Sequence, residues 1–209
     1  MLAKKVFYED SELKNLRLEL TDKGSIYFLG RNLTLSNCAL ILKVPTARLL
    51  IRQVRFIDCT FEVKQQLTNF QDWIRTSLKG CRFKGRFSGN DFGHWPEYGN
   101  EPEYQFGAIE DCDFSEADLN YCRFIGCETR TLRLPRWPYF SFLEPVRHAE
   151  ELRRVPWPGS FGDIIVDNLY KSPTRTMALT FNAPSVAKRF GTTPEALKAV
   201  IERFDCFFF

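Results

Sequence analysis

The sequence lacks the features that mark exported, membrane-spanning and many catalytic proteins. Its first residues, MLAKKVFYEDSELKN, hold no apolar segment followed by a cleavage site, and no run approaches the roughly 20 apolar residues that cross a bilayer. The motifs GxSxG, HExxH, GxGxxG and the Walker loop are absent, and the only histidines are His94 and His148. We therefore expect a cytoplasmic protein that is not an enzyme and holds no cofactor or metal.

Charge and aromatic content narrow the possibilities further. A formal net charge of +3 over 209 residues is too small to indicate nucleic-acid binding, which needs a concentrated basic face. Methionine and tryptophan are scarce, with 2 and 4 residues, whereas the chain has 20 phenylalanines. We infer a globular protein whose fold uses phenylalanine repeatedly as a rigid core residue.

The cysteines indicate an internal repeat. Five of them lie two residues before a large apolar residue, in the pairs Cys38/Leu40, Cys59/Phe61, Cys81/Phe83, Cys112/Phe114 and Cys122/Phe124. Their successive spacings along the chain, 21, 22, 31 and 10, indicate a period near 20, one insertion and a final half period. No CxxC occurs, so we expect free thiols packed in the core rather than metal ligands or disulfides.

The repeat is unbroken between Gly107 and Thr131. The pentads GAIED, CDFSE, ADLNY, CRFIG and CETRT follow one another in steps of five. Their first positions hold small residues, and their third positions, except Thr129, hold large apolar ones. Such a step describes one side of a square coil, so four pentads close a turn whose strands stack on the next turn.

The pentad Ala117-Asp118-Leu119-Asn120-Tyr121 and its neighbours resemble the A(D/N)Lxx motif of the pentapeptide-repeat family. The resemblance covers roughly residues 26 to 131, and about half of these residues fit the five-residue register of the motif. It implies a right-handed quadrilateral β-helix, so we predict a mainly β fold with a C-terminal α-helical region. We divide the chain into an N-terminal cap at 1–25, an interrupted solenoid at 26–134 and a helical region at 135–209.

A segment rich in glycine, aromatic and acidic residues interrupts the solenoid at 85–107. Loops on rigid scaffolds often carry function, and aromatic residues ringed by charge are typical of interface hot spots. His94, Trp95, Tyr98 and Tyr104 are therefore candidate partner-binding residues. The alternative is a lid that packs its aromatic rings on the coil.

After Leu134 the repeat stops, and the proline-rich segment 134–159 is expected to cap the open strand edges, with a helix at about Pro145–Arg154. Further on, Gly191, Thr193 and Pro194 predict two helices joined by a short turn, a helix-turn-helix-like hairpin. The terminal FDCFFF is too apolar to stay in water, so we expect it to dock on its own domain or to pair two copies in a homodimer.

An acidic surface is predicted on the regular pentads. The outward positions of 107–131 hold six acidic residues against Arg123 and Arg130, a local charge of −4. The partner-binding candidates among them are Glu110, Asp111, Asp113, Glu116 and Asp118. We therefore expect a protein partner with a basic surface and no membrane partner.

Three functions remain open at this point. The family resemblance implies either an immunity protein or antitoxin that neutralises a cognate bacterial toxin, or a DNA mimic that binds gyrase. A DNA-binding regulator would instead use the C-terminal hairpin, with Thr193, Glu195 and Lys198 in the base-reading positions. We favour the immunity or antitoxin role, because the regular coil is too short for a continuous acidic DNA mimic, and because Glu195 would approach the phosphates of a nucleic acid bound by this hairpin.

Overall fold

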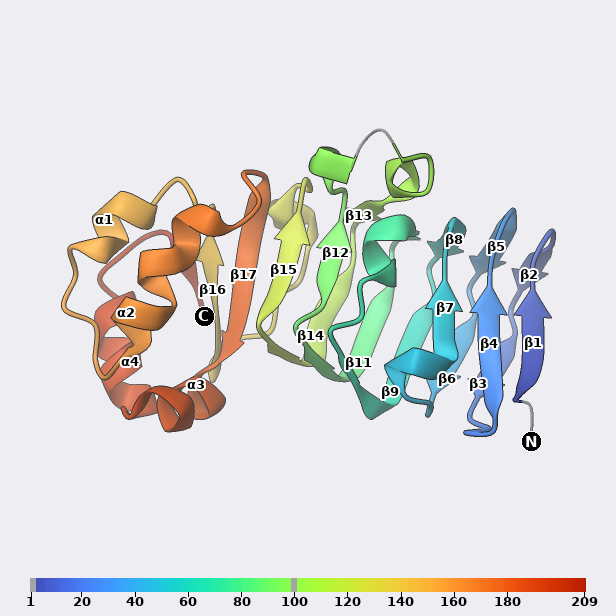
Figure 1. Cartoon of the computed structure of the whole chain (residues 1–209), viewed down its shortest axis with the longest axis horizontal. Helices are drawn as coiled ribbons and strands as arrows, with labels where there is room; N and C mark the ends of the chain where they lie inside the picture. The colour runs from blue at the N-terminus through green and yellow to red at the C-terminus, as the bar shows by residue number, and fades with distance from the viewer. Residues whose placement is uncertain (1–2, 99–100) are drawn as a thin grey trace.

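The chain forms a stack of parallel β-coils with helices gathered at its C-terminal end (Figure 1). The computed structural model describes residues 3–98 and 101–209. Three sheets, β1-β4-β7 (sheet A), β2-β5-β8-β10-β13 (sheet B) and β3-β6-β9-β11-β14 (sheet C), are parallel throughout. The mainly β solenoid with a C-terminal helical region, expected from the repeat, is confirmed.

Sheets B and C each contain five strands, so the chain completes about four turns. The strands of the solenoid are β1 (Lys4–Tyr8), β2 (Glu12–Lys14), β3 (Arg17–Leu20), β4 (Ser25–Leu29), β5 (Leu33–Ser36), β6 (Ala39–Leu42), β7 (Leu49–Ile51), β8 (Val54–Ile57), β9 (Thr60–Thr68), β10 (Ser77–Lys79), β11 (Arg82–Ser88), β12 (Asp91–Gly93), β13 (Ala108–Glu110), β14 (Asp113–Asn120) and β15 (Cys122–Ile125). The short 3-10 helices η1 (Thr46–Arg48) and η2 (Asp72–Arg75) precede β7 and β10. Residues 1–25, assigned to a cap, hold β1, β2 and β3, each paired in register with the following coil.

Strand register sets the length of one turn. Along sheet C, Arg17, Ala39, Thr60, Arg82 and Asp113 are successive partners. Their separations in sequence, 22, 21, 22 and 31, match the spacing of the cysteines, and the longest one contains the insertion. The period and the insertion inferred from the cysteines are therefore confirmed.

The regular pentads make the four sides of the last coil. Their third residues Ile109, Phe114, Leu119 and Phe124 are all buried and point into the stack. The fifth pentad does not form a side, because its residues Thr129–Thr131 turn into a 3-10 helix, η5. Leu132 and Leu134 then close over the core end.

Residues with positive φ turn the chain at the corners. Asn15, Asn37, Asp58, Gly80 and Asp111 occupy one corner column with φ between 50° and 63°. The N–H groups of the first four donate to carbonyls of the next coil at 2.8–3.1 Å. Asparagine, aspartate and glycine reach this conformation at little cost, which explains why they precede Leu16 and the four cysteines of the column.

Those four cysteines, Cys38, Cys59, Cys81 and Cys112, are free, buried and stacked beside this corner. Each Sγ donates to a carbonyl of the preceding coil, at 3.3–3.7 Å. Cys122 does the same half a turn further on, to the Phe87 carbonyl at 3.5 Å. The thiols therefore act as small core residues that also satisfy backbone acceptors.

We expect these thiols to be unreactive in the folded protein. Burial raises the pKa of Cys122 and of Cys127 to about 12 and that of Cys206 to about 11, so these three are almost entirely protonated at pH 8. Cys38, Cys59, Cys81 and Cys112 lie buried in the core, where a reagent does not reach them. A colorimetric thiol reagent should count fewer than one fast-reacting thiol per native chain and all seven after denaturation. Several rapidly reacting thiols in the native protein would contradict this packing.

The C-terminal region extends the solenoid by antiparallel pairing. In sheet D, β17 (Thr176–Asn182) pairs with β15, β16 (Tyr139–Leu143) pairs with β17, and β18 (Phe207–Phe208) pairs with β16. The outer edge of β15, one side of the last coil, is thus covered by β17. Of the segment 134–159, expected to cap the strand edges, Leu134 closes over the core end, but its strand β16 lies one strand further out and the edge of β15 is covered by β17 instead.

Helices cover the extension and enclose a second core rich in phenylalanine. They are α1 (Ala149–Arg153), α2 (Phe161–Ile164), η6 (Val166–Lys171), α3 (Ala183–Phe190) and α4 (Pro194–Ile201). The predicted hairpin is confirmed: Gly191 ends α3 with φ 68°, and the Thr193 side chain caps α4. The first helix is shorter than expected, because Pro145–His148 form turns before α1 begins.

The C-terminal phenylalanines dock within the chain. Phe207 is buried against Phe142, with ring centroids 4.4 Å apart, and β18 hydrogen-bonds to β16. Phe204 and Phe209 pack on the same core. Intramolecular docking, one of the two expectations for the tail, is confirmed, so burial of Phe207 needs no second copy.

Candidate functional site

The insertion begins later than the sequence indicated. Residues 85–93 belong to the coil, as the end of β11 and as β12, and His94 still pairs with Ile125, so the described part of the insertion is 95–98 and 101–107. This stretch connects sheet D to sheet B through two 3-10 helices, η3 (Pro96–Tyr98) and η4 (Tyr104–Phe106), and lies over one corner of the stack (Figure 1). The earlier boundary at Gly85 was wrong because Gly85 and Gly89 turn the coil rather than open a loop.

In the part of the insertion that the structure describes, aromatic side chains pack on arginines of the coil. The Arg123 guanidinium lies 5.1 Å from the Trp95 ring centroid and forms two hydrogen bonds to the buried Asp91, at 2.6 and 2.7 Å. His94 continues the strand pairing, donating its backbone N–H to Ile125. Tyr98 ends η3, and its side chain lies outside the described part. Trp95 therefore packs on the coil, as expected for a lid, and is not part of a free recognition loop.

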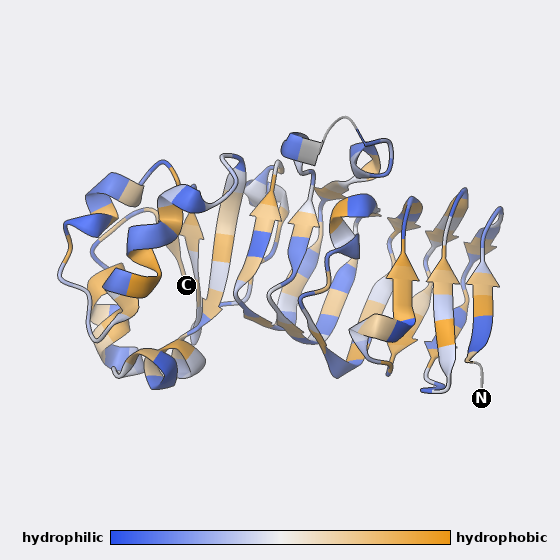
Figure 2. Cartoon of the chain, viewed as in Figure 1, coloured by the Kyte–Doolittle hydropathy of each residue, from blue (hydrophilic) through white to orange (hydrophobic). Residues whose placement is uncertain are grey.

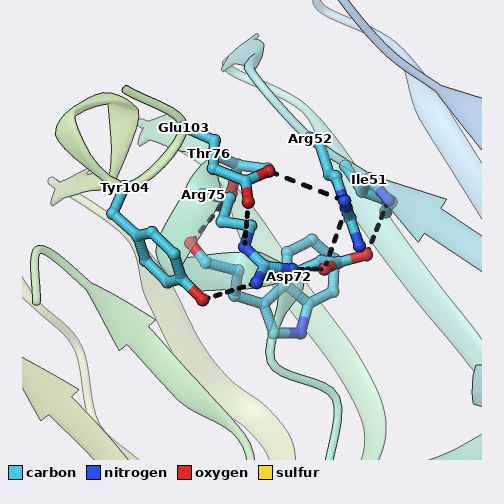
Figure 3. A network of polar contacts seen from close by, with 8 residues as sticks. Ile51, Arg52, Asp72, Arg75, Thr76, Glu103 and Tyr104 are labelled. Atoms are coloured by element: carbon cyan, nitrogen blue, oxygen red, sulfur yellow. Dashed lines mark hydrogen bonds and ion pairs between the residues drawn. The ribbon is translucent and has the colours of Figure 1, made fainter. Parts of the chain in front are cut away.

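Tyr104 anchors the insertion to a buried network (Figure 3). Its ring is almost fully buried beneath the Arg75 guanidinium, 4.6 Å from the centroid, and its hydroxyl accepts a hydrogen bond from Arg75. Arg75 also donates to Asp72 at 2.8 Å. Arg52 lies 3.6 Å from Glu103, so the insertion is held at two points.

Asp72 explains why a coil can lack one strand. Where a strand of sheet A would follow β7, the chain forms the 3-10 helix η2. The Asp72 carboxylate accepts the Ile51 N–H at 3.0 Å, a donor that β7 would otherwise leave unpaired inside the protein. The stretch from Lys64 to Arg75, which does not fit the repeat in sequence, thus joins the stack: Lys64–Thr68 continue β9, and Asp72 of η2 accepts the Ile51 N–H (Figure 3).

We expect Asp72→Ala to lower the free energy of unfolding by about 3 kcal/mol, because it leaves the buried Ile51 N–H without an acceptor and removes one acceptor of the Arg75 guanidinium. Asp72→Asn keeps an acceptor oxygen for Ile51 and should lose clearly less. Urea unfolding followed by circular dichroism measures both. Equal losses for the two variants would mean that charge, not the backbone contact, is what matters.

The five acidic candidates do not form an uncompensated acidic surface. Glu110 lies 3.1 Å from Lys79, Glu116 lies 2.9 Å from Lys84, and Asp113 lies 3.9 Å from Arg82 and 3.8 Å from Arg133. Asp118 is the strand partner of Arg86. The preceding coil thus supplies one basic residue for each of four acids and offsets the charge of −4 counted along the sequence. The acidic face is a charge-paired ladder.

Asp113 is the most constrained of these acids. Burial raises the pKa of its carboxyl, but hydrogen bonds from Ser115 and the charges of Arg133 and Arg82 outweigh this effect, so the pKa lies below its usual value. Asp111 has a different position, at the positive-φ corner beside a polar hollow of about 610 Å³. The hollow is lined by Asp58, Gly80 and Asp111 of this corner and by Arg130 and Arg133.

The predicted site residues therefore fall into two groups that face different directions. Trp95 and Tyr104 belong to the insertion at the corner before sheet B. Asp113, Glu116 and Asp118 lie on sheet C, beyond β13 and the next corner. One flat partner surface cannot cover both groups, because the coil turns between them.

Sequence reasoning missed an apolar patch on the outer side of sheet A. It consists of Phe7, Phe28 and Leu50, which are consecutive partners in β1, β4 and β7. The Phe7 and Phe28 rings stack at 4.7 Å, and Phe7 keeps 55% of its surface exposed. Figure 2 shows the hydrophobic residues along these strands. The signal was present in their sequence spacing, 21 and then 22, which is the same period as that of the cysteines.

A groove of about 320 Å³ runs along this patch. Its rim carries charges of both signs, from Glu9, Arg31, Arg52 and Glu103. Glu103 comes from the insertion and contacts Arg52, so the groove borders the network of Figure 3. An apolar centre with a charged rim is the usual anatomy of a protein interface.

Other kinds of site are not evident in the part of the chain that the structure describes. It contains no group of three or more His, Cys, Asp or Glu placed to hold a metal ion, and no helix long and apolar enough to cross a membrane. Comparisons with protein-family models, curated proteins and solved structures found no match to this chain.

Proposed function

We propose that this chain is a non-catalytic protein-binding module of the immunity or antitoxin kind, which neutralises a toxin by covering its surface. The apolar patch of Phe7, Phe28 and Leu50 is the observation that carries the proposal. Exposed apolar patches with polar rims mark protein-interaction sites. A stacked coil holds such a patch rigid, so little conformational freedom is lost on binding.

The insertion supports the same surface. Tyr104 is fixed by Arg75, and Glu103 is held near Arg52 at the rim of the groove. Of the residues predicted from the sequence, Tyr104 is therefore the one best placed to support partner binding. Glu110, Asp113 and Glu116 have basic partners in the neighbouring coil and serve the register of the stack.

The two alternatives have less support. A DNA mimic needs a continuous acidic surface, whereas on sheet C the acidic strand β14 lies beside the basic strand β11 and pairs with its charges. In the hairpin, Arg189 lies over the Tyr121 ring at 5.2 Å, and Lys198 pairs with Glu202 at 3.3 Å. Both basic residues are thus engaged by side chains of the same chain. We also propose a reducing compartment such as the cytoplasm, in keeping with seven free thiols.

Affinity capture with matched variants tests the proposal. We expect the double change Phe7→Ser and Leu50→Ser to weaken capture of one abundant protein from the source cells at least about tenfold, because both side chains belong to the patch. Ile164→Ser, at a side chain that is 50% exposed on α2, is the matched control and should retain capture. The captured protein, expressed alone, should arrest growth, and co-expression of the wild-type chain should relieve the arrest.

Two results would overturn the proposal. Capture that survives the patch variant, but is lost when Asp111, Asp113, Glu116 and Asp118 are changed to Lys, would place the interface on sheet C. Recovery of DNA alone, with loss on changing Lys188, Arg189 and Lys198, would favour the regulator.

A further inference from the structure

The two ends of the solenoid differ. At the C-terminal end, β17 covers β15, and Leu132 and Leu134 close the core. At the other end, β1, β2 and β3 are the outermost strands of sheets A, B and C, and no described residue pairs with their outer edges. Edges of this kind are normally protected, since their free N–H and C=O groups can add another strand.

The core is also incompletely covered at this open end. Tyr8, Leu13 and Leu18 are the inward residues of three successive sides and are only partly buried, whereas their partners Leu29, Leu35 and Leu40 in the next coil are almost fully buried. Leu16, at the adjoining corner, is 44% exposed. The end therefore combines three unpaired strand edges with an apolar centre.

The strand sequences at this end are complementary to themselves. β2 reads Glu12-Leu13-Lys14, so an antiparallel copy centred on Leu13 places Glu12 opposite Lys14 of the second chain, and Lys14 opposite its Glu12. The inward residues Tyr8, Leu13 and Leu18 are five residues apart. A twofold axis through Leu13 therefore also brings Tyr8 opposite Leu18 of the second chain, and Glu9 opposite its Arg17.

We propose that two copies of this chain stack end to end through β1, β2 and β3, related by a twofold axis at Leu13. The inward residues Tyr8, Leu13 and Leu18 meet one another across the axis, the acidic residues Glu9 and Glu12 meet basic residues at the rim, and strand edges of each copy are paired. The C-terminal tails lie at the far ends of such a dimer. The apolar patch remains on the outside, so this inference goes beyond the proposed function and does not depend on it.

Charge reversal tests the dimer. Sedimentation equilibrium of the full chain should give twice the mass of 24.4 kDa. Glu12→Lys and Lys14→Glu each place like charges opposite one another twice, so each should raise the dimer dissociation constant about tenfold or more. The double variant, with both changes, should restore the wild-type constant.

Glu62→Lys is the matched control. Glu62 pairs with Lys64 at 2.8 Å in the same arrangement as Glu12 and Lys14, but on β9, inside the stack. The Glu62→Lys variant should leave the dimer dissociation constant unchanged. A wild-type chain that is monomeric at high micromolar concentration would overturn the proposal, and so would a dimer that withstands Glu12→Lys, because its contact must lie elsewhere, for example at the tail.

Discussion

Phe83→Ala should lower the free energy of unfolding by about 4 kcal/mol, because a buried phenylalanine cut to alanine loses its transfer energy and leaves a cavity. Phe83 stacks between Phe61 and Phe114, at centroid distances of 4.8 and 4.4 Å, and touches Trp73 edge-on at 5.6 Å. The cavity would open between coils whose backbone spacing is fixed by hydrogen bonds, so little relaxation can fill it.

Phe7→Ala is the matched control for this prediction. Phe7 also stacks on another phenylalanine, yet it remains 55% exposed, so its loss should change stability by less than about 1 kcal/mol. Urea unfolding followed at two wavelengths measures the free energy of unfolding of both variants. Similar losses for the two would show that the aromatic column does not hold the coils together.

The sequence allowed the coil to be predicted because its determinants are local. A small residue, a large residue and a five-residue step specify one side of the coil without reference to distant segments. The same holds for the hairpin, whose limits at Gly191 and Thr193 follow from backbone conformation and capping. Asn37, Asp58 and Asp111, each directly before a cysteine, could have located the corners as well.

Features that depend on neighbours one turn away were not predictable from local sequence. Glu110 is neutralised by Lys79, which lies one coil earlier in the chain, so a charge count over 107–131 misjudged the surface. The strand that covers β15 comes from Thr176–Asn182, after the helices α1, α2 and η6. Asp72 lies in a stretch without the repeat. Its carboxylate accepts the Ile51 N–H because η2 stands where a further strand of sheet A would otherwise pair with β7.

Glycines in the stack should differ sharply in their tolerance of a side chain. Gly85 has φ 104° and lies between Val63 and Ala117 of the adjacent coils. A Cβ at this position would be 2.1 Å from the Val63 carbonyl oxygen, a backbone atom held by the sheet. We therefore expect Gly85→Ala to lower the free energy of unfolding by about 4 kcal/mol or more.

Gly191→Ala separates the effect of crowding from that of backbone conformation. Gly191 also has positive φ, 68°, but it ends α3 in open space, where an added Cβ would meet no surrounding atom within 4 Å. Only the conformational cost of about 1 to 2 kcal/mol applies there. Thermal unfolding should show a much larger drop for Gly85→Ala. Equal drops would mean that the coils can move apart locally, and that the rigid surface on which partner binding rests is softer than the packing implies.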